Sequence, residues 1–237
     1  MEYPETIKKG GRVFKVRYRQ SKSLRSSITF KNGEIVITLS RFLIGRKREE
    51  GVRKFLDWAE HKIDKVDGSS FVRPEYRDGG FVHTHNKIYE IKVEQGRGKR
   101  NFSRLFDEYL IHIKLKEDSS NEDVKPLVQK VIIKDQLSYL KSVVRELNDL
   151  YFQEELGAIR FKRMSSRFGS CSSKRNLNFA FNLLLTPREV FRYVCIHELA
   201  HLKEMNHSKK FWALVEIAEP NYKEYEKWLK QNSFLLI

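Results

Sequence analysis

Residues 197–201 read His-Glu-Leu-Ala-His, and a further histidine, His207, follows ten residues after His197. On a helix, side chains four residues apart lie on one face about one turn apart, so His197 and His201 can bind the same metal ion. Glu198 lies to one side of this pair and can act as a general base without being a ligand. His207 supplies a third ligand and leaves the fourth zinc position free, which is typical of catalytic zinc sites. The pattern predicts a zinc-dependent hydrolase with one zinc ion per chain.

The flanking sequence predicts that this motif lies on a buried helix. Thr186 is a candidate N-cap, Pro187 suits the first helical position, and Glu189 can complete a capping box. Asparagine tolerates the left-handed conformation that ends many helices, so we expect this helix to end near Asn206. Such a turn would bring His207 back towards the metal. Apolar residues at helical spacing support the buried helix: Val190, Phe191, Val194, Cys195, Leu199 and Leu202.

Two other interpretations keep the same histidines. In the first, they serve packing or hydrogen bonding in a buried helix and bind no metal. In the second, the zinc site is structural and closed by a fourth protein ligand. Cys195 is poorly placed for that role, because it lies two residues from His197 on the same helix. The second interpretation describes a basic nucleic-acid-binding protein with a structural zinc site and no turnover.

The charge of the chain is strongly positive. Its 237 residues include 46 Lys and Arg against 31 Asp and Glu, a formal net charge of +15. Such a surplus favours encounters with polyanions, so we expect DNA or RNA as a partner through a basic surface. The basic residues are spread over several clusters, however, and solubilising faces explain them equally well.

Composition also bounds the class of protein. A hydrophobic content of 40% and an aromatic content of 12% suffice for a core. No apolar run approaches the length of a transmembrane helix, and the first residues lack the pattern of a signal peptide. The two cysteines, Cys171 and Cys195, make neither a disulfide framework nor a Cys-x-x-Cys pair. We therefore expect a cytoplasmic protein that is not inserted in a membrane; its oligomeric state is not indicated.

Hydrophobic patterning divides the chain into a strand-rich and a helix-rich part. Residues 11–40 alternate as three strands, with a hairpin turn at Lys31-Asn32-Gly33-Glu34, and residues 46–66 follow as an amphipathic helix. Residues 80–116 return to strand character. The acidic stretch 117–123 breaks the pattern before a long helix over 124–153. No internal repeat is evident.

We therefore expect an α+β protein with two parts, a strand-rich region with one helix over 1–118 and a core that carries the metal motif over 119–237; the resemblance given below implies that this core is zincin-like. In the core, a strand over 158–164 and a hairpin over 167–185 precede the metal-binding helix. The hairpin is a candidate edge strand for pairing with an extended substrate, and Gly169 would permit close backbone approach. A tight packing corner is the equally good alternative for Gly169.

Several segments together resemble the YgjP-like metal-dependent hydrolases, which belong to the zincin group and are similar in their core to SprT-like and WLM metallopeptidases. The segments are Arg167–Ser172, Asn176–Asn178, His197–His201, Asn206–Ser208 and Phe211–Trp212. The family's usual Trp before Gly-Ser-Cys is Phe168 here. The spacing of the three histidines also equals that of metzincins, but Glu204 stands where those enzymes carry a glycine.

The resemblance implies zinc ligands at His197, His201 and His207, with Glu198 as the catalytic base. It also implies a core in which a small antiparallel sheet packs on helices. Relatives of SprT-like and WLM type act on DNA-bound proteins, which extends the expectation to nucleic-acid-associated substrates. The predicted reaction is cleavage of a peptide bond by a zinc-activated water. Candidate donors to the developing oxyanion are Arg167, Ser170, Tyr193 and Lys203.

Overall fold

A computed structural model describes residues 3–9, 12–31, 34–64, 72–164 and 166–236. Its elements confirm the predicted α+β class. The chain divides into two compact units, a first unit of residues 1–68 and 227–237 and a second unit of residues 69–226. The predicted division between residues 118 and 119 stays a prediction. Within the described residues, no helix is both long and apolar enough to cross a membrane.

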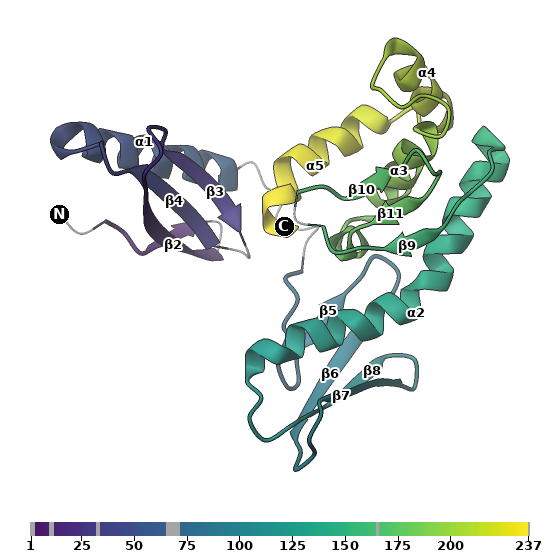
Figure 1. Cartoon of the computed structure of the whole chain (residues 1–237), viewed down its shortest axis with the longest axis horizontal. Coiled ribbons are helices and arrows are strands. Elements are labelled where there is room, and N and C mark those ends of the chain that lie inside the picture. Colours follow the sequence, from purple (N-terminus) through teal and green to yellow (C-terminus); the bar gives the residue numbers. More distant parts are fainter. Residues whose placement is uncertain (1–2, 10–11, 32–33, 65–71, 165, 237) are drawn as a thin grey trace. The chain divides into compact units, whose positions relative to one another are not determined.

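The first unit contains a four-stranded sheet, one complete helix (Figure 1) and the part of the C-terminal helix from residue 227 on. The strand order is β1-β2-β4-β3; β2 and β4 run parallel, and the other neighbours are antiparallel. The sequence predicted β2, β3, β4 and α1 but missed β1. The predicted turn residues Asn32 and Gly33 lie outside the described residues. The elements are β1 (Thr6–Lys9), β2 (Arg12–Ser21), β3 (Ser27–Lys31), β4 (Glu34–Ser40) and α1 (Gly45–Asp64).

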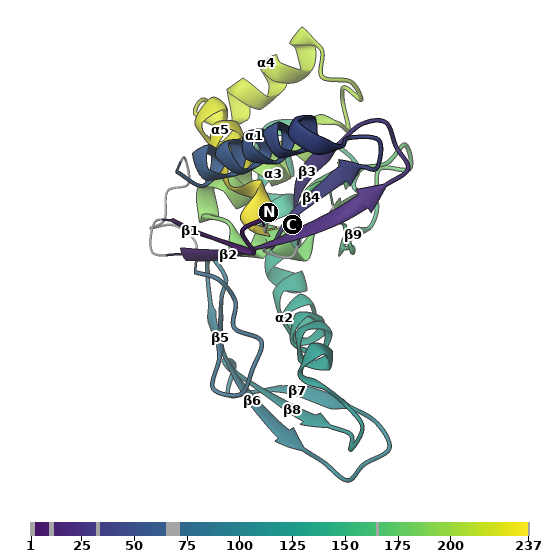
Figure 2. The same cartoon turned by 90° about the vertical axis from the view of Figure 1, so that its left-hand side faces the viewer.

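Alternation along the strands sorts the side chains of this first sheet onto two faces. Phe14 and Val16 of β2 face inward with Ile35, Ile37 and Leu39 of β4. Helix α1 covers this inner face with Val52, Ala59 and Ile63, as Figure 2 shows for the ribbon. The outer face consequently carries the intervening polar side chains of β2.

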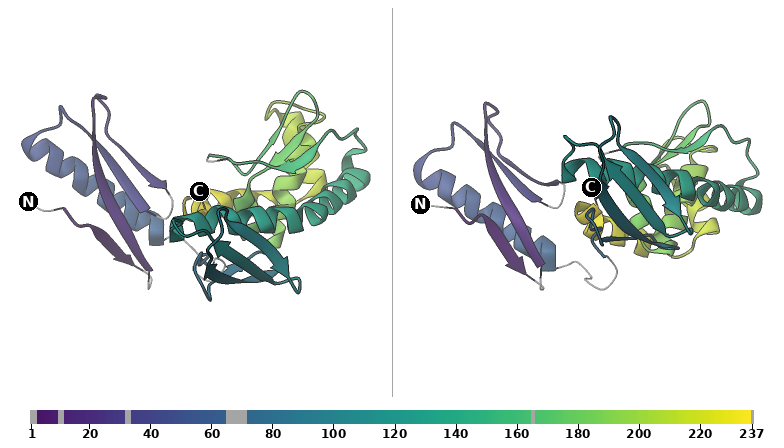
Figure 3. Two further views of the ribbon diagram at one scale, coloured as in Figure 1. Left: turned by 60° about the horizontal axis from the view of Figure 1, so that its bottom comes forward. Right: turned by 90° about the horizontal axis from the view of Figure 1, so that it is seen from below.

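The second unit opens with another four-stranded sheet, and α2 packs against β7 and β8 (Figure 3). Ser120 and Asp123 form a capping box just before α2, as the acidic stretch suggested. A π-helical turn over Asn148–Phe152 extends α2, and Gln153 ends it in the left-handed conformation. The elements are β5 (Phe81–His83), β6 (Ile88–Gln95), β7 (Phe102–Phe106), β8 (Leu110–Leu115) and α2 (Val124–Leu147).

The two four-stranded sheets have the same topology, which the sequence did not reveal. The order β5-β6-β8-β7 repeats β1-β2-β4-β3, with parallel and antiparallel neighbours at the same places. In the first two strands of each sheet, paired core residues correspond at a separation of 75 residues along the chain. Ile7 pairs with Phe14 in the first sheet, and Val82 pairs with Tyr89, each 75 residues later, in the second. The expectation that the chain holds no internal repeat is therefore wrong at the level of structure.

A third, small sheet lies next to the motif helix and has the order β10-β11-β9. Strand β9 runs parallel to β11, so the sheet is mixed rather than wholly antiparallel as predicted. The hairpin strand predicted to reach residue 185 gives way to a 3₁₀-helix over Phe181–Leu185. The remaining elements are β9 (Ile159–Phe161), β10 (Gly169–Cys171), β11 (Leu177–Phe179), α3 (Arg188–Ala200), α4 (Lys209–Ala218) and α5 (Tyr222–Leu236).

Candidate active site

Helix α3 carries the motif and is buried along most of its length. Its start differs from the prediction. Pro187, not Thr186, is the N-cap, and the hydroxyl of Thr186 donates to the carbonyl of Leu183 instead of capping the helix. Because Thr186 is buried at the end of the preceding 3₁₀-helix, its side chain is satisfied there. The predicted capping box with Glu189 is therefore wrong, although the helix itself is confirmed.

The segment after α3 returns the third histidine to the helix. The helix ends at Ala200 with His201 as its C-cap, earlier than the predicted end near Asn206. Asn206 is not among the described residues with positive φ, so the predicted left-handed turn at that residue is wrong. Ser208 caps the next helix by accepting a hydrogen bond from the backbone N–H of Phe211. This cap fixes the backbone directly beside His207.

His197, His201 and His207 form one cluster, and their candidate ligand atoms all lie within 4.8 Å of one another. The Nε2 atoms of His197 and His207 are 3.1 Å apart. A tetrahedral zinc ion at ~2.0–2.1 Å from each nitrogen would separate two ligand nitrogens by about 3.4 Å, so the spacing fits. The sequence predicted these three residues as ligands, and the structure brings them together; their role as ligands stays a proposal.

A backbone contact fixes the orientation of His201. Its Nδ1 lies 3.1 Å from the carbonyl oxygen of Glu204, in the turn that follows α3. A carbonyl oxygen only accepts, so Nδ1 carries the proton and Nε2 keeps its lone pair for a metal. Sequence reasoning missed this role of Glu204, because its backbone rather than its side chain makes the contact.

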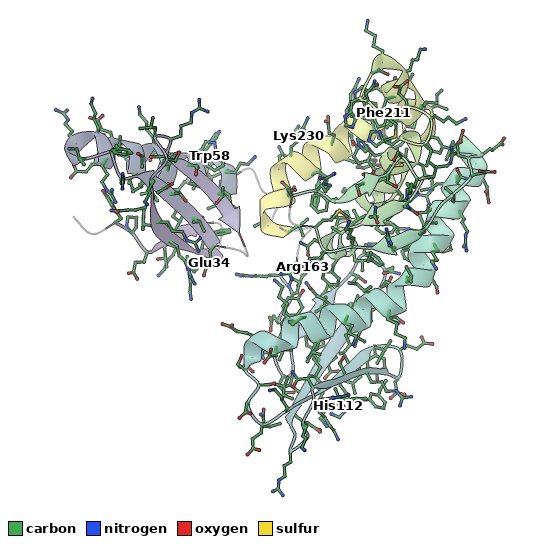
Figure 4. All side chains as sticks on the ribbon, in the orientation of Figure 1. Glu34, Trp58, His112, Arg163, Phe211 and Lys230 are labelled. Atoms are coloured by element: carbon green, nitrogen blue, oxygen red, sulfur yellow. The ribbon has the colours of Figure 1, made fainter. Side chains whose placement is uncertain are left out.

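Aromatic side chains close one side of the histidine cluster. Phe211 is fully buried on α4 (Figure 4). The centroid of its ring lies 4.5–4.9 Å from the ring centroids of all three histidines. Trp212 stacks on His207 and on Tyr222. Burial, and then the neighbouring imidazoles, lower the pKa of His197 to about 3. The ring of His197 is therefore held in the neutral form that binds metal.

Glu198 is buried on α3 and faces strand β10 rather than solvent. A methyl group at Gly169 would lie 2.5 Å from its Oε1, so only glycine allows this approach of strand to carboxyl. Burial raises the pKa of Glu198 to about 8, and the charge of Arg167 and the N–H of Cys171 oppose that rise. Its Oε2 has no hydrogen-bond partner among the described residues. A buried carboxyl of this kind is suited to receiving and releasing a proton.

Strand β10 is an edge strand of the small sheet, since it pairs only with β11 among the described strands. Asn178 of β11 donates towards Ser170 of β10 and accepts from Arg160 of β9, so the three strands are cross-linked by side chains. Gly169 packs tightly against Glu198, which agrees with the alternative of a tight packing corner; pairing of this strand with a substrate stays a prediction. A regular pattern of asparagine and serine opposite each other was the signal that sequence reasoning left unused.

The four candidate oxyanion donors lie in different settings. Lys203 is 3.6 Å from Glu154, which also binds Arg175, and Tyr193 is buried with its ring edge towards His197. The hydroxyl of Ser170 bonds with Asn178. Arg167 is exposed, and its charge acts on Glu198. Of the two cations among the four, Arg167 is the one whose charge lowers the pKa of Glu198.

The other residues considered from the sequence serve the scaffold. His85 is partly buried, with ring nitrogens 3.1 Å from the carbonyl oxygen of Leu184 and 3.2 Å from the hydroxyl oxygen of Tyr139. Its ring lies 4.3 Å from that of Phe191 on α3. Burial raises the pKa of Cys171 to about 11, so this thiol is a poor nucleophile. Cys171 and Cys195 are both free thiols.

Comparisons with known proteins found a matching family and several similar proteins. A family model described as "YgjP-like, metallopeptidase domain" matches residues 24–232. The UTP pyrophosphatase of Escherichia coli (strain K12) is 36% identical over 69 residues, which cover 27% of this chain and 41% of that protein. The chain thus matches less than half of the length of this curated relative.

Two solved structures of archaeal metallopeptidase zymogens are also similar. Abylysin of Pyrococcus abyssi is 23% identical with a TM-score of 0.36, over 39% of this chain and 93% of that chain. Jannalysin of Methanocaldococcus jannaschii is 25% identical with a TM-score of 0.35, over 40% of this chain and 96% of that chain.

Proposed function

The chain belongs to the YgjP-like metallopeptidase family, and from this premise we propose a zinc-dependent hydrolase that cleaves a peptide bond. We propose His197, His201 and His207 as the ligands of one zinc ion per chain and Glu198 as the catalytic base. The proposal rests on the set of donor atoms. The ligand atoms of three imidazoles lie within 4.8 Å of one another, and the buried carboxyl of Glu198 directly follows His197 on α3. Imidazole nitrogens are typical zinc ligands.

The number of ligands favours catalysis over a structural role. Among the described residues, the cluster contains three metal-binding side chains, and a structural zinc site has four. Cys195, the alternative fourth ligand, is fully buried on α3 and does not belong to the cluster. The interpretation as a nucleic-acid-binding protein with a closed zinc site is therefore the weaker one.

Each residue then has a distinct task. A bound zinc ion would supply Lewis-acid chemistry, activating water and polarising the scissile carbonyl. Glu198 takes the proton of the attacking water and passes it to the leaving amine. Gly169 and the N–H of Cys171 hold the carboxyl in place, and Phe211 excludes water from one side of the cluster. The free edge of β10 pairs with an extended substrate.

A second candidate reaction is hydrolysis of a nucleoside triphosphate. Two observations favour it: the name of the Escherichia coli relative, a UTP pyrophosphatase, and the exposed Arg167 beside Glu198. A guanidinium there can bind phosphate oxygens as readily as it stabilises an oxyanion. Nucleic-acid-associated substrates and the cytoplasmic compartment stay predictions.

One pair of variants tests the site against both substrates. Glu198→Gln should lower hydrolysis about 10²- to 10⁴-fold while the zinc content, measured by elemental analysis, stays at one per chain. Glu189→Gln, the same change at an exposed position of α3, is the control and should keep full activity. Assays with a peptide library and with UTP decide the substrate class. Full activity of Glu198→Gln on both would contradict the mechanism.

A further inference from the structure

The outer face of the first sheet is strongly basic. The exposed side chains of Lys15, Arg17 and Arg19 alternate along β2 on the side away from α1. Successive members of such a series lie about 6.7 Å apart along a strand. Lys8 of β1 extends the face, because its neighbour Ile7 is in the core. The sheet thus presents a row of cations at regular spacing.

Few acidic groups balance this row. Arg17 pairs with Glu34 of β4 at 2.7 Å. Among the described residues, Lys8, Lys15 and Arg19 have no acidic partner within 4.0 Å. Hydroxyl side chains lie next to the cations, since the register places Thr6 beside Lys15 and Thr38 beside Arg19.

The second sheet shows that the fold does not require these charges. The positions equivalent to Lys15, Arg17 and Arg19, 75 residues later, are Glu90, Lys92 and Glu94. The same topology and the same inward pattern are thus compatible with acidic residues at two of three places. The opposite side of the first unit differs as well. Helix α1 carries six Lys and Arg against five Asp and Glu, so its surface charge is nearly balanced.

From these observations we infer that the outer face of the β1-β2-β4-β3 sheet binds the phosphate backbone of nucleic acid. Regularly spaced Lys and Arg with neighbouring hydroxyl groups are the side chains that contact phosphates. The outward positions of β2 and β4 carry no aromatic ring on which bases could stack, so binding should not depend on base sequence. This surface lies in the first unit and its function does not depend on the proposed hydrolase activity.

Charge reversal within the full chain tests the surface. The double variant Lys15→Glu/Arg19→Glu introduces the residues that the second sheet carries at equivalent positions, so the strand pattern is kept. The matched control, Lys47→Glu/Lys54→Glu, makes the same change of net charge on α1. Circular dichroism establishes that both variants fold. Fluorescence anisotropy with a labelled mixed-sequence DNA duplex then gives the affinity over a range of salt concentrations.

We expect the sheet variant to bind at least about tenfold more weakly than the control at low salt. The neutral variant Lys15→Gln/Arg19→Gln should lower the slope of log affinity against log salt by about two, one for each lost phosphate contact. Equal losses in the sheet and helix variants would overturn the inference, as would the absence of duplex binding by the wild type. If the sheet variant does not fold, the neutral variant decides by its slope alone.

Anionic vesicles are the competing probe, because Leu24, Phe42 and Ile44 are exposed in the loops that follow β2 and β4. Vesicles of phosphatidylserine and phosphatidylcholine should not displace the duplex from the wild-type chain. Binding of the chain to these vesicles that is lost in Lys15→Glu/Arg19→Glu, while its duplex binding stays equal to that of the control, would assign this face to a membrane surface and overturn the assignment to nucleic acid.

Discussion

The first and second sheets have one topology and two different surfaces. Inward-facing residues match position by position, since Val16, Ile35 and Ile37 correspond to Ile91, Ile111 and Ile113. Outward-facing residues do not match: β2 carries Lys15, Arg17 and Arg19 where the equivalent strand β6 carries Glu90, Lys92 and Glu94. The fold therefore constrains only the inward half of each strand, and the outward half is available for a separate function.

The largest loss of stability should follow substitution at equivalent core positions of the two sheets. Ile37 and Ile113 are fully buried, and replacing either by alanine should cost about 2–5 kcal/mol through lost contacts and the cavity left behind. Hydrogen exchange read by mass spectrometry should show faster exchange in the sheet that carries the change. Equal acceleration in both sheets for Ile37→Ala would mean that the two units open together.

The next largest effect should come from metal binding, which should stabilise the second unit and not the first, because the histidine cluster lies in the second unit. Zinc at about a hundredfold excess over its Kd should stabilise the second unit by about 2.7 kcal/mol. Amides of β2 and β4 should exchange at unchanged rates, and His197→Ala should abolish the effect. Slower exchange throughout the first sheet on zinc addition would contradict this prediction.

A fall in pH should also lower the stability of the second unit more than that of the first. Burial lowers the pKa of His85 to about 4, against 6.5 for an unfolded chain. Between these pH values the unfolded state binds more protons, so stability is kept above pH 6.5 and lost as the pH falls towards 4. After allowance for its partial exposure, His85 should contribute about 2 kcal/mol to this loss. The only described histidine of the first unit, His61, is exposed.

Urea unfolding as a function of pH measures this contribution. The variant His85→Asn cannot titrate in this range, so its stability should vary less between pH 6.5 and 4 than that of the wild type. Parallel pH profiles for the two proteins would show that another group dominates.

The smallest loss of stability should follow removal of a polar group that the second sheet has and the first sheet lacks. The hydroxyl of Tyr89 donates to Asp135 and accepts from Gln136, whereas the equivalent residue of the first sheet is Phe14. Tyr89→Phe should cost about 1–2 kcal/mol, because Asp135 keeps Lys87 as a partner. Chemical denaturation measures the cost. A stability equal to that of the wild type would show that this cluster contributes nothing.

The sequence predicted most elements and the histidine cluster, because periodic apolar residues and fixed ligand spacing are local signals. It failed where the chain uses a different local hydrogen bond or turn from the one that the motif favours. Thr186 bonds with Leu183 rather than capping α3, and no left-handed residue at Asn206 was needed to return His207. Both predictions assumed that the strongest local cap is used, but burial decides between alternative partners.

The repeat was missed for a related reason. Comparison of whole sequences weighs outward residues such as Lys15 and Glu90 as heavily as inward ones such as Val16 and Ile91. Only the strand register shows which positions to compare. The contact between Gly169 and Glu198 likewise joins a strand and a helix about thirty residues apart, a distance at which no local pattern operates.

The first unit is discontinuous in sequence, which has a consequence for synthesis on the ribosome. Leu235 packs against its core, and Lys62 donates to the carbonyl of Lys230. These contacts become available only after the whole of the second unit has been translated. The first sheet must therefore wait, with part of its apolar core uncovered, while the second unit folds. A nascent chain arrested before residue 227 should be more sensitive to protease in its first sixty residues than the released protein.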